Sequence, residues 1–199
     1  MKLYFSPGAC SLSPHIVQLE AGLSADLEKV DLRAKQTESG NDFLSINPKG
    51  YVPALQLDDG SILTEGPAIV QYLADRAPGK NLIPPPGSIE RYRAMEWLNF
   101  ISTEIHKAFG ALFNPRMPNE AKTVARELLA KRIDFLESRL KDSTFLMGEQ
   151  FTVADAYLFT VLNWTGKFDI KLPPAVQAYY QRIASRPAVR AAMEKEGLV

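Results

Sequence analysis

The stretch Ser6-Pro7-Gly8-Ala9-Cys10-Ser11-Leu12-Ser13-Pro14 separates a short apolar run from the start of a helix. The preceding Lys2-Leu3-Tyr4-Phe5 is typical of a β-strand, which the proline and glycine of the stretch end. Ser13 is placed to cap a helix that begins at Pro14, because proline at this position loses no hydrogen bond. The stretch therefore predicts a strand, a turn and a helix, with the only cysteine of the chain, Cys10, in the turn.

The position of Cys10 favours chemical reactivity of its thiol. At the start of a helix, a thiol faces unpaired backbone N–H groups and the positive end of the helix dipole, which favour the thiolate. A free cysteine can equally be a small buried hydrophobic residue without chemistry. Position alone leaves both interpretations of Cys10 open.

Length and composition limit the class of protein. A chain of 199 residues with 46% hydrophobic residues can form one large domain or two small ones around a real core. The 23 basic and 23 acidic residues balance, so no net charge draws the chain to nucleic acid or to an anionic membrane. One cysteine allows no internal disulfide, and we expect neither a signal peptide nor a membrane span. We therefore expect a cytoplasmic protein.

The first 77 residues alternate between strand and helix patterns. After the first strand and helix, the sequence predicts a strand at 27–32, a surface loop at 33–42 followed by an irregular helix, strands at 53–57 and 62–63 around an Asp-Gly turn, and a helix at 65–75 capped by Thr64. The order is β-α-β-α-β-β-α, which predicts a mixed sheet with helices on its faces.

A segment rich in proline and glycine, 76–87, marks a linker, and the pattern beyond it is helical only. We predict domains at 1–80 and 87–199. Two long helices are expected after Ser88 and Asn119, with inward positions Tyr92, Met95, Leu98, Ile101, Ile105 and Phe109 on the first and Val124, Leu128, Ile133, Leu136 and Leu140 on the second. Thr152-Val153-Ala154-Asp155 is a capping box that opens a nearly all-apolar central helix, and further helices begin at Pro173-Pro174 and near Pro187.

Two further stretches suggest ligand binding by the first domain. In Asn47-Pro48-Lys49-Gly50-Tyr51-Val52-Pro53-Ala54-Leu55, a cis Val52–Pro53 bond would turn the N–H and C=O of Val52 toward an extended, peptide-like ligand. Thr64-Glu65-Gly66 opens a helix, where N–H groups can hold an anion and the Glu65 carboxylate an ammonium. Ordinary helix capping also explains Thr64-Glu65-Gly66.

The second domain offers a third group of polar residues. Asn99, Thr103 and His106 recur at i, i+4 and i+7 and are expected on one helix face, beside the apolar stripe. A single histidine in a helix is usually structural, which is our interpretation of His15. The polar neighbours of His106 favour a functional role for it.

These motifs together resemble the cytosolic glutathione transferases, over essentially the whole chain. The resemblance rests on Asn47-Pro48-Lys49-Gly50 with Val52-Pro53-Ala54-Leu55, on Thr64-Glu65-Gly66 with Ala68-Ile69, and on Phe151-Thr152-Val153-Ala154-Asp155-Ala156. The Ser-Pro-Gly-Ala-Cys-Ser-Leu-Ser opening, with His106, is similar to the bacterial beta class. The resemblance implies an α/β thioredoxin-like N-terminal domain that binds glutathione and an all-α C-terminal domain that forms the electrophile site.

The resemblance also implies roles for single residues. Cys10, Ser11 and His106 would be the catalytic residues. Glutathione contacts are implied for Cys10, Lys35, Val52, Pro53, Glu65, Gly66, Asn99, Thr103, Glu104, His106 and Lys107. Many members of the family have serine where this chain has Gly66, so weaker anchoring is expected there. No metal site is expected.

The implied reaction is attack of the glutathione thiolate, with glutathione as co-substrate, on small electrophilic and apolar compounds, including halogenated ones, in detoxification. Phe109, Phe113, Met117 and Tyr157 are expected to line the cleft for the electrophile. Two alternatives stay open: glutathione-dependent thiol-disulfide exchange, peroxidase or dehalogenase chemistry through Cys10, and a non-catalytic binding protein of the same fold. The family also implies a homodimer, with no nucleic-acid or membrane partner.

Overall fold

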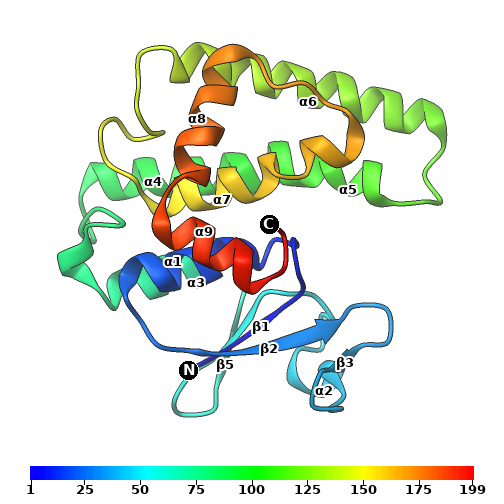
Figure 1. The fold of residues 1–199 in the computed structure, drawn as a ribbon, viewed down its shortest axis with the longest axis vertical. Helices are drawn as coiled ribbons and strands as arrows, with labels where there is room; N and C mark the ends of the chain where they lie inside the picture. Colours follow the sequence, from blue (N-terminus) through cyan, green and yellow to red (C-terminus); the bar gives the residue numbers. More distant parts are fainter. The chain divides into compact units, whose positions relative to one another are not determined.

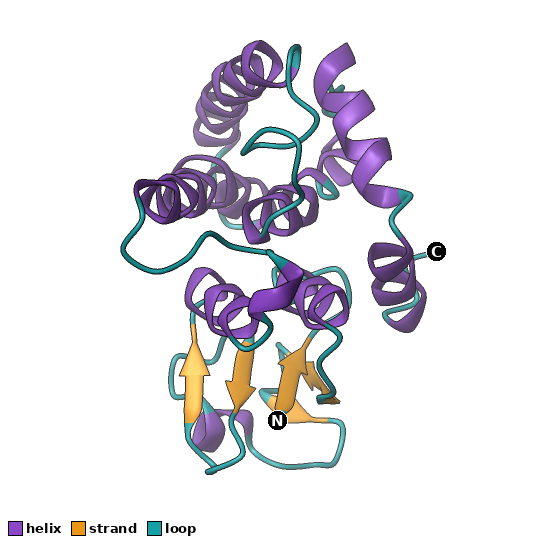
Figure 2. Ribbon diagram, turned by 90° about the vertical axis from the view of Figure 1, so that its left-hand side faces the viewer, coloured by secondary structure: helices purple, strands orange, loops and turns teal.

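A computed structural model describes all of residues 1–199. The chain forms two compact units, one of Met1–Ile83 with Ser185–Val199 and the other of Pro84–Ala184. Every strand belongs to the first unit, and the second contains helices only (Figures 1 and 2). The predicted fold class, an α/β part followed by an all-helical part, is confirmed.

The first unit is built on a five-stranded mixed sheet in the order β3-β2-β1-β4-β5. β1 is parallel to β2 and antiparallel to β4, and the pairs β2–β3 and β4–β5 are antiparallel. The elements are β1 (Lys2–Phe5), α1 (Leu12–Ala21), β2 (Asp26–Asp31), β3 (Gln36–Thr37), α2 (Phe43–Ile46), β4 (Ala54–Gln56), β5 (Ile62–Thr64), α3 (Gly66–Asp75), the 3₁₀ turn η1 (Pro78–Lys80) and α9 (Pro187–Lys195). β3 is the one strand that the sequence did not predict.

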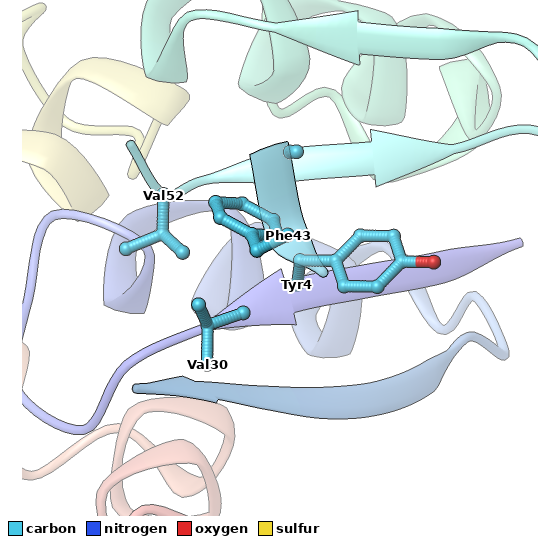
Figure 3. Close-up of a cluster of buried hydrophobic side chains, with 5 residues drawn as sticks. Tyr4, Val30, Phe43 and Val52 are labelled. Carbon is cyan, nitrogen blue, oxygen red and sulfur yellow. The ribbon is translucent and has the colours of Figure 1, made fainter. Parts of the chain in front are cut away.

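Side chains on both faces of β1 are buried, which explains its uninterrupted apolar sequence. Successive side chains of a strand point to opposite faces, so Leu3 and Phe5 lie on one face and Tyr4 on the other. The Tyr4 ring lies 5.8 Å from that of Phe43, in a cluster completed by Val30, Val52 and Ala54 (Figure 3). The cluster anchors Val52 directly before the start of β4.

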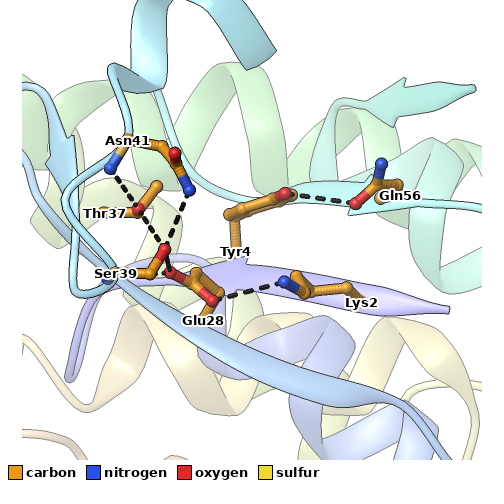
Figure 4. Close-up of polar contacts among 7 residues, drawn as sticks. All are labelled: Lys2, Tyr4, Glu28, Thr37, Ser39, Asn41 and Gln56. Atoms are coloured by element: carbon orange, nitrogen blue, oxygen red, sulfur yellow. Dashed lines mark hydrogen bonds and ion pairs between the residues drawn. The ribbon is translucent and has the colours of Figure 1, made fainter. Parts of the chain in front are cut away.

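Polar contacts fold the segment after β2 back onto the sheet (Figure 4). The Glu28 carboxylate accepts hydrogen bonds from the N–H and hydroxyl of Ser39, at 3.1 and 2.6 Å. These bonds from Ser39, with smaller contributions from Thr37 and Lys2, lower the pKa of Glu28 to about 2. The predicted surface loop therefore contains the short edge strand β3.

Three predicted helix starts are wrong by one or two residues. α1 begins at Leu12 and not at Pro14, because N–H···O bonds from Ala9 to Ser6 and from Leu12 to Ala9 make the preceding turn already helix-like. α3 begins at Gly66 with Glu65 at the cap position, in place of a start at Glu65. The helix after Pro118 already includes Asn119, which was predicted as its cap.

The second unit consists of α4 (Ile89–Phe100), the π-helix η2 (Ile101–His106), α5 (Lys107–Phe113), α6 (Asn119–Leu140), α7 (Val153–Leu162), the 3₁₀ turn η3 (Thr165–Phe168) and α8 (Pro174–Ala184). Every residue of α7 is buried, as the sequence predicts for the central helix. No helix of the chain has the length and apolar composition that a membrane span needs.

Parts of the predicted inward stripes are wrong. Tyr92 and Met95 of α4 and Val124 and Leu128 of α6 are exposed. The buried positions beside them include the small residues Ala94 and Ala125. Alanine occupies these positions because the helices pack closely there. A pattern of large apolar side chains does not include alanine, so it assigns the buried face incorrectly.

The last helix differs from the predicted domain division. α9 packs against α1, as Figure 1 also shows, and Ser185–Val199 belongs to the first unit. Arg186, directly before α9, donates two hydrogen bonds to the Glu20 carboxylate, at 2.6 and 2.9 Å. The two compact units divide between residues 83 and 84, within the linker 76–87, and the C-terminal residues belong to the first unit.

The predicted capping box of α7 is present and belongs to a larger buried network. One oxygen of the Asp155 carboxylate accepts from Leu146 N–H and the Tyr179 hydroxyl, at 2.9 and 2.8 Å. The other accepts from the N–H and hydroxyl of Thr152, at 2.8 and 2.9 Å. All four donors point at the Asp155 carboxylate, so position 155 requires a side chain that only accepts hydrogen bonds.

Asp155→Asn should lower the free energy of unfolding by ~3 kcal/mol, because its amide NH₂ would face two buried donors. Urea unfolding followed by circular dichroism measures the loss. The matched control is Asp134→Asn on the exposed side of α6, which should change stability by less than ~0.5 kcal/mol. Equal effects of the two variants would show that the network contributes nothing specific.

Candidate functional site

Sheet pairing brings the three predicted motifs of the first unit together. β4 pairs with β1 through Leu3 and Leu55 and with β5 through Ala54 and Thr64. β4 begins directly after Val52-Pro53, β5 ends directly before Glu65, and β1 leads into the Cys10 turn. Residues separated by more than 50 positions therefore meet at one edge of the sheet.

The Cys10 thiol contacts the second motif directly. Its Sγ donates a hydrogen bond to the carbonyl oxygen of Val52, at 3.1 Å. Burial, and secondarily the charge of Glu65, raise the pKa of the thiol to about 11, although the N–H groups of Cys10 and Ser11 act in the opposite direction. The expectation that the helix start makes Cys10 a thiolate is therefore wrong for the ligand-free chain, because burial outweighs the backbone N–H groups.

The Ser11 hydroxyl is engaged within the turn. It is buried, accepts from Ser6 N–H at 3.1 Å and donates to the Ser6 carbonyl at 3.2 Å. The hydroxyl therefore closes the turn, which does not support the predicted catalytic use of this group. The group of Ser11 that faces the Cys10 sulfur is its backbone N–H.

The Val52–Pro53 peptide bond is cis, as predicted. The Val52 carbonyl, expected to be free, is occupied by the Cys10 thiol, whereas the Val52 N–H has no partner within the chain. Pro53 is buried, and a side chain built on Gly66 would meet it at 3.8 Å, which is ordinary contact. The Gly66 N–H also has no partner within the chain.

Glu65 has an unusual backbone conformation, with φ of +70°. Such conformations cost about 1–3 kcal/mol in a non-glycine residue and cluster at functional sites. Its exposed carboxylate accepts a hydrogen bond of 2.6 Å from Lys49 Nζ, which also donates to the Thr64 hydroxyl at 3.0 Å. Lys49 belongs to the motif Asn47-Pro48-Lys49-Gly50, but no sequence pattern pairs it with Glu65.

Lys35 contacts the middle of the 47–53 loop. Its Nζ donates to the Gly50 carbonyl at 2.9 Å and lies 5.9 Å from the centre of the Tyr51 ring. Its backbone φ is +56°, the left-handed region that a turn requires. Lys35 and Lys49 thus place two ammonium groups along this loop.

In the second unit, His106 belongs to an aromatic group. Its Nδ1 lies 2.7 Å from the Tyr157 hydroxyl, and its ring is edge-on to Trp164 with centroids 4.8 Å apart. Burial, with a smaller effect of the Lys107 charge, lowers the pKa of His106 to about 4. His106 is therefore neutral near pH 7 and has one N–H to donate, which contradicts any role as a cation that favours a thiolate.

The other predicted residues of this helix do not share the surroundings of His106. Thr103 donates to the backbone carbonyl of Asn99 at 3.0 Å, and both residues are exposed. A groove of about 390 Å³ against α6 is lined in part by Thr103, Glu104 and Lys107. Arg132 of α6 donates from Nε to the Glu104 carboxylate there, at 2.9 Å. The π-helical turn Ile101–His106 changes the spacing of these positions, and the sequence did not predict it.

Aromatic rings continue from His106 along the second unit. Phe113 is half exposed and lies edge-on to Trp164 and Phe168, with centroids 5.4 and 4.9 Å away. Phe109 is buried against the same two rings. Of the predicted cleft residues, Phe109 and Phe113 thus pack against Trp164, which the sequence did not single out, and Tyr157 contacts His106, which lies against the same ring. Met117 lies in the loop after α5.

The candidate residues therefore form two sets, one in each compact unit. The first unit contains Cys10, Ser11, Lys35, Val52, Pro53, Glu65 and Gly66. The second unit contains Asn99, Thr103, Glu104, His106 and Lys107. No three His, Cys, Asp or Glu side chains form a group that could hold a metal ion.

Comparison with known proteins gives the same family for both halves of the chain. Residues 8–76 match the family model of the glutathione S-transferase N-terminal domain, and residues 100–187 match that of the C-terminal domain. The chain is 49% identical to glutathione S-transferase GstA of Escherichia coli O157:H7 over 200 residues, which cover all of both chains.

Solved structures agree with this result. The structure of a sphingomonad glutathione S-transferase complexed with glutathione is similar with a TM-score of 0.95 and 46% identity, and all of both chains is covered. A bacterial beta-class glutathione S-transferase from Sphingomonas chungbukensis is similar with the same TM-score, identity and coverage.

The lowered pKa of His106 predicts a specific pH dependence of stability. As the pH falls from about 6.5 toward 4, the unfolded chain binds a proton at this imidazole that the folded chain excludes, so the folded state loses stability. We expect His106 to account for a loss of about 3 kcal/mol over this range. In His106→Asn this part of the loss should be absent.

Urea unfolding of both proteins at pH 7 and pH 4.5 measures the difference, because all other titrating groups contribute equally. An NMR titration of the imidazole should give a midpoint near pH 4. Identical pH dependence in the two proteins, or a midpoint above 6, would contradict the burial of this ring.

Proposed function

The chain belongs to the glutathione S-transferase family, within its bacterial beta class, and on this basis we propose how its residues bind and activate glutathione. The protein is a transferase with glutathione as co-substrate. The proposal rests mainly on one observation: the Cys10 thiol contacts the Val52 carbonyl and is affected by the charge of Glu65, and the N–H groups of Val52 and of Gly66, next to Glu65, have no partner within the chain.

Each part of glutathione has a chemically complementary group in the first unit. The Val52 N–H can receive a carbonyl of the cysteinyl residue, as in the pairing of an added strand. The Gly66 N–H, at the start of α3, suits the γ-glutamyl carboxylate, and Glu65 suits its ammonium. Lys35, which donates to the Gly50 carbonyl, is the cation for the glycyl carboxylate. Pro53 forms an apolar wall beside Gly66.

The chemistry follows from protonation states. With a pKa of about 11, the Cys10 thiol remains protonated at neutral pH, and on ligand binding its single S–H leaves the Val52 carbonyl and donates to the glutathione sulfur. The Ser11 N–H adds a second donor. The glutathione thiol releases its proton to solvent water, and these donors stabilise the resulting sulfur anion. The anion then attacks an electrophilic carbon, a C–S bond forms, and the leaving group, such as a halide, departs with the bonding electrons.

The family also implies roles for residues of the second unit. We assign to it the contacts of Asn99, Thr103, Glu104, His106 and Lys107 with glutathione, in which neutral His106 donates its N–H. The rings of Phe113, Trp164 and Phe168 offer an apolar surface suited to a small aromatic or halogenated electrophile. A homodimer and a cytoplasmic, detoxifying role are further parts of this proposal.

The two alternatives differ in what they require. Thiol-disulfide exchange through Cys10 needs a thiolate, which the raised pKa of the thiol opposes. A non-catalytic protein of this fold that does not bind glutathione would have no use for the Glu65 carboxylate, whose backbone conformation costs free energy. Conjugation is therefore the function that the geometry supports best.

Cys10→Ala should retain conjugation of chlorodinitrobenzene, with kcat/KM reduced by no more than about tenfold, because only one of two donors is lost. Disulfide exchange with a mixed disulfide of glutathione should vanish in the same variant. Loss of both activities would make Cys10 the residue on which conjugation depends. No turnover and no retention of the wild-type protein on immobilised glutathione would favour the binding protein.

Glu65→Gln should raise KM for glutathione about fivefold with little change in kcat, since an exposed ion pair with the ligand ammonium is lost. Glu38→Gln, at an exposed carboxylate of the same unit, is the matched control and should leave KM unchanged. An unchanged KM in Glu65→Gln would place the γ-glutamyl ammonium elsewhere.

A further inference from the structure

The C-terminal residues end in a defined turn against the Cys10 turn. After α9, Gly197 adopts φ of +69°, Gly197 N–H donates to the Glu194 carbonyl, and Leu198 N–H donates to the Met193 carbonyl. These two bonds and the left-handed residue are a Schellman motif, which fixes the direction of the chain after a helix. The motif holds Glu196, its cap residue, in one orientation.

The Glu196 side chain is fully buried, which is unusual for a carboxylate. One of its oxygens accepts from the backbone N–H of Gly8 at 2.9 Å. The other lies 2.9 Å from His15 Nδ1, which must carry the hydrogen because a carboxylate only accepts. Glu196 thus joins the turn before α1 to the body of α1.

Gly8 lies two residues before Cys10, so its anchor acts on the turn that positions the thiol. Gly8 is itself left-handed, with φ of +68°, and a side chain there would come within 3.2 Å of Leu198. In Figure 1 the C-terminus lies beside the segment that joins β1 to α1. The turn is therefore held by two sets of contacts. Ser11 bonds to Ser6 within the turn, and Glu196 of the C-terminal residues bonds to Gly8.

We propose that Glu196 is a positioning residue for Cys10. Its carboxylate holds Gly8 N–H and so keeps the Cys10 thiol and the Ser11 N–H in place at the Val52 carbonyl. The functional part of this inference rests on the proposed role of this turn in binding the glutathione sulfur. The structural part, control of the thiol by the C-terminal residues, applies without any ligand.

A purely structural role for this carboxylate predicts something different. The pair of Arg186 with Glu20 also ties the start of α9 to α1, at 2.6 and 2.9 Å, and is distant in sequence from the Cys10 turn. If Glu196 only anchored α9, loss of the Arg186–Glu20 pair would have the same effect on Cys10. The two connections therefore provide a matched comparison.

The first measurement is the rate of Cys10 alkylation by iodoacetamide without glutathione, since Cys10 is the only thiol of the chain. Glu196→Ala should raise this rate about tenfold, because loss of a charge-assisted hydrogen bond frees the turn and exposes the thiol. Glu196→Gln should remain within about twofold of wild type, since its amide oxygen can still accept from Gly8 N–H, and the other tautomer of His15 offers Nδ1 as an acceptor to its NH₂. Glu20→Gln should lower the melting temperature without raising the alkylation rate.

The second measurement separates positioning from stability in catalysis. Glu196→Ala should raise KM for glutathione about tenfold, while Glu196→Gln and Glu20→Gln keep KM near the wild-type value. If Glu196→Ala does not fold, Glu196→Asp replaces it, because its shortened side chain moves the same carboxylate away from Gly8.

Three outcomes would overturn the inference: no rise of the alkylation rate in Glu196→Ala or Glu196→Asp, an equal rise in Glu20→Gln, or no rescue by Glu196→Gln. A raised alkylation rate with no conjugation in the wild-type protein would retain the positioning role and reject the proposed function.

Discussion

The pairing of β4 with both β1 and β5 is the constraint on which the site depends. Its register is fixed by burial, since Leu55 points into the core and Ala54 into the cluster around Tyr4. A slip by one residue would exchange the two faces of β4 and expose Leu55. With the register fixed, Val52 and Glu65 must lie at adjacent strand ends, whatever the loops between them contain.

The same constraint explains why short, unpaired backbone segments can bind a ligand here. Val52 is anchored by its side chain in the apolar cluster, so its N–H is presented at a fixed place without secondary-structure partners. Gly66 is fixed in the same way by its position at the start of α3. Donors on rigid elements lose little entropy on binding, which favours recognition of an extended peptide.

The sequence predicted those features that depend on local backbone chemistry. The strand that ends before Cys10 and the capping box at Thr152 each have signatures within a few residues, whereas no local pattern decides that the Val52–Pro53 bond is cis. Strand β3 escaped prediction because it consists of two polar residues, whose pairing with Val30 and Asp31 of β2 no local pattern indicates. The helix faces were partly misassigned because the packed stripes use alanine.

The properties of the candidate site depend on contacts that no local pattern contains. The pKa of Cys10 follows from burial and from Glu65, 55 positions along the chain. The neutral state of His106 follows from packing in the second unit, and the π-helical turn around it has no signature in the sequence. Residue types could thus be identified from the sequence, while their protonation states could not.

The charge arrangement around Cys10 links ligand binding to the acidity of the bound sulfur. Glu65 is an anion whose field opposes a thiolate at the Cys10 turn, and Lys49, with its ammonium 2.6 Å from one Glu65 oxygen, offsets part of that field. In the proposed binding mode, the γ-glutamyl ammonium adds a second positive charge beside the carboxylate. The opposition of Glu65 then weakens only when glutathione is present, while the N–H groups of Cys10 and Ser11 remain in place. The anion of the glutathione sulfur would therefore meet less opposing charge in the complex. In the free protein, the same negative field keeps the Cys10 thiol protonated, which limits its side reactions when no co-substrate is bound.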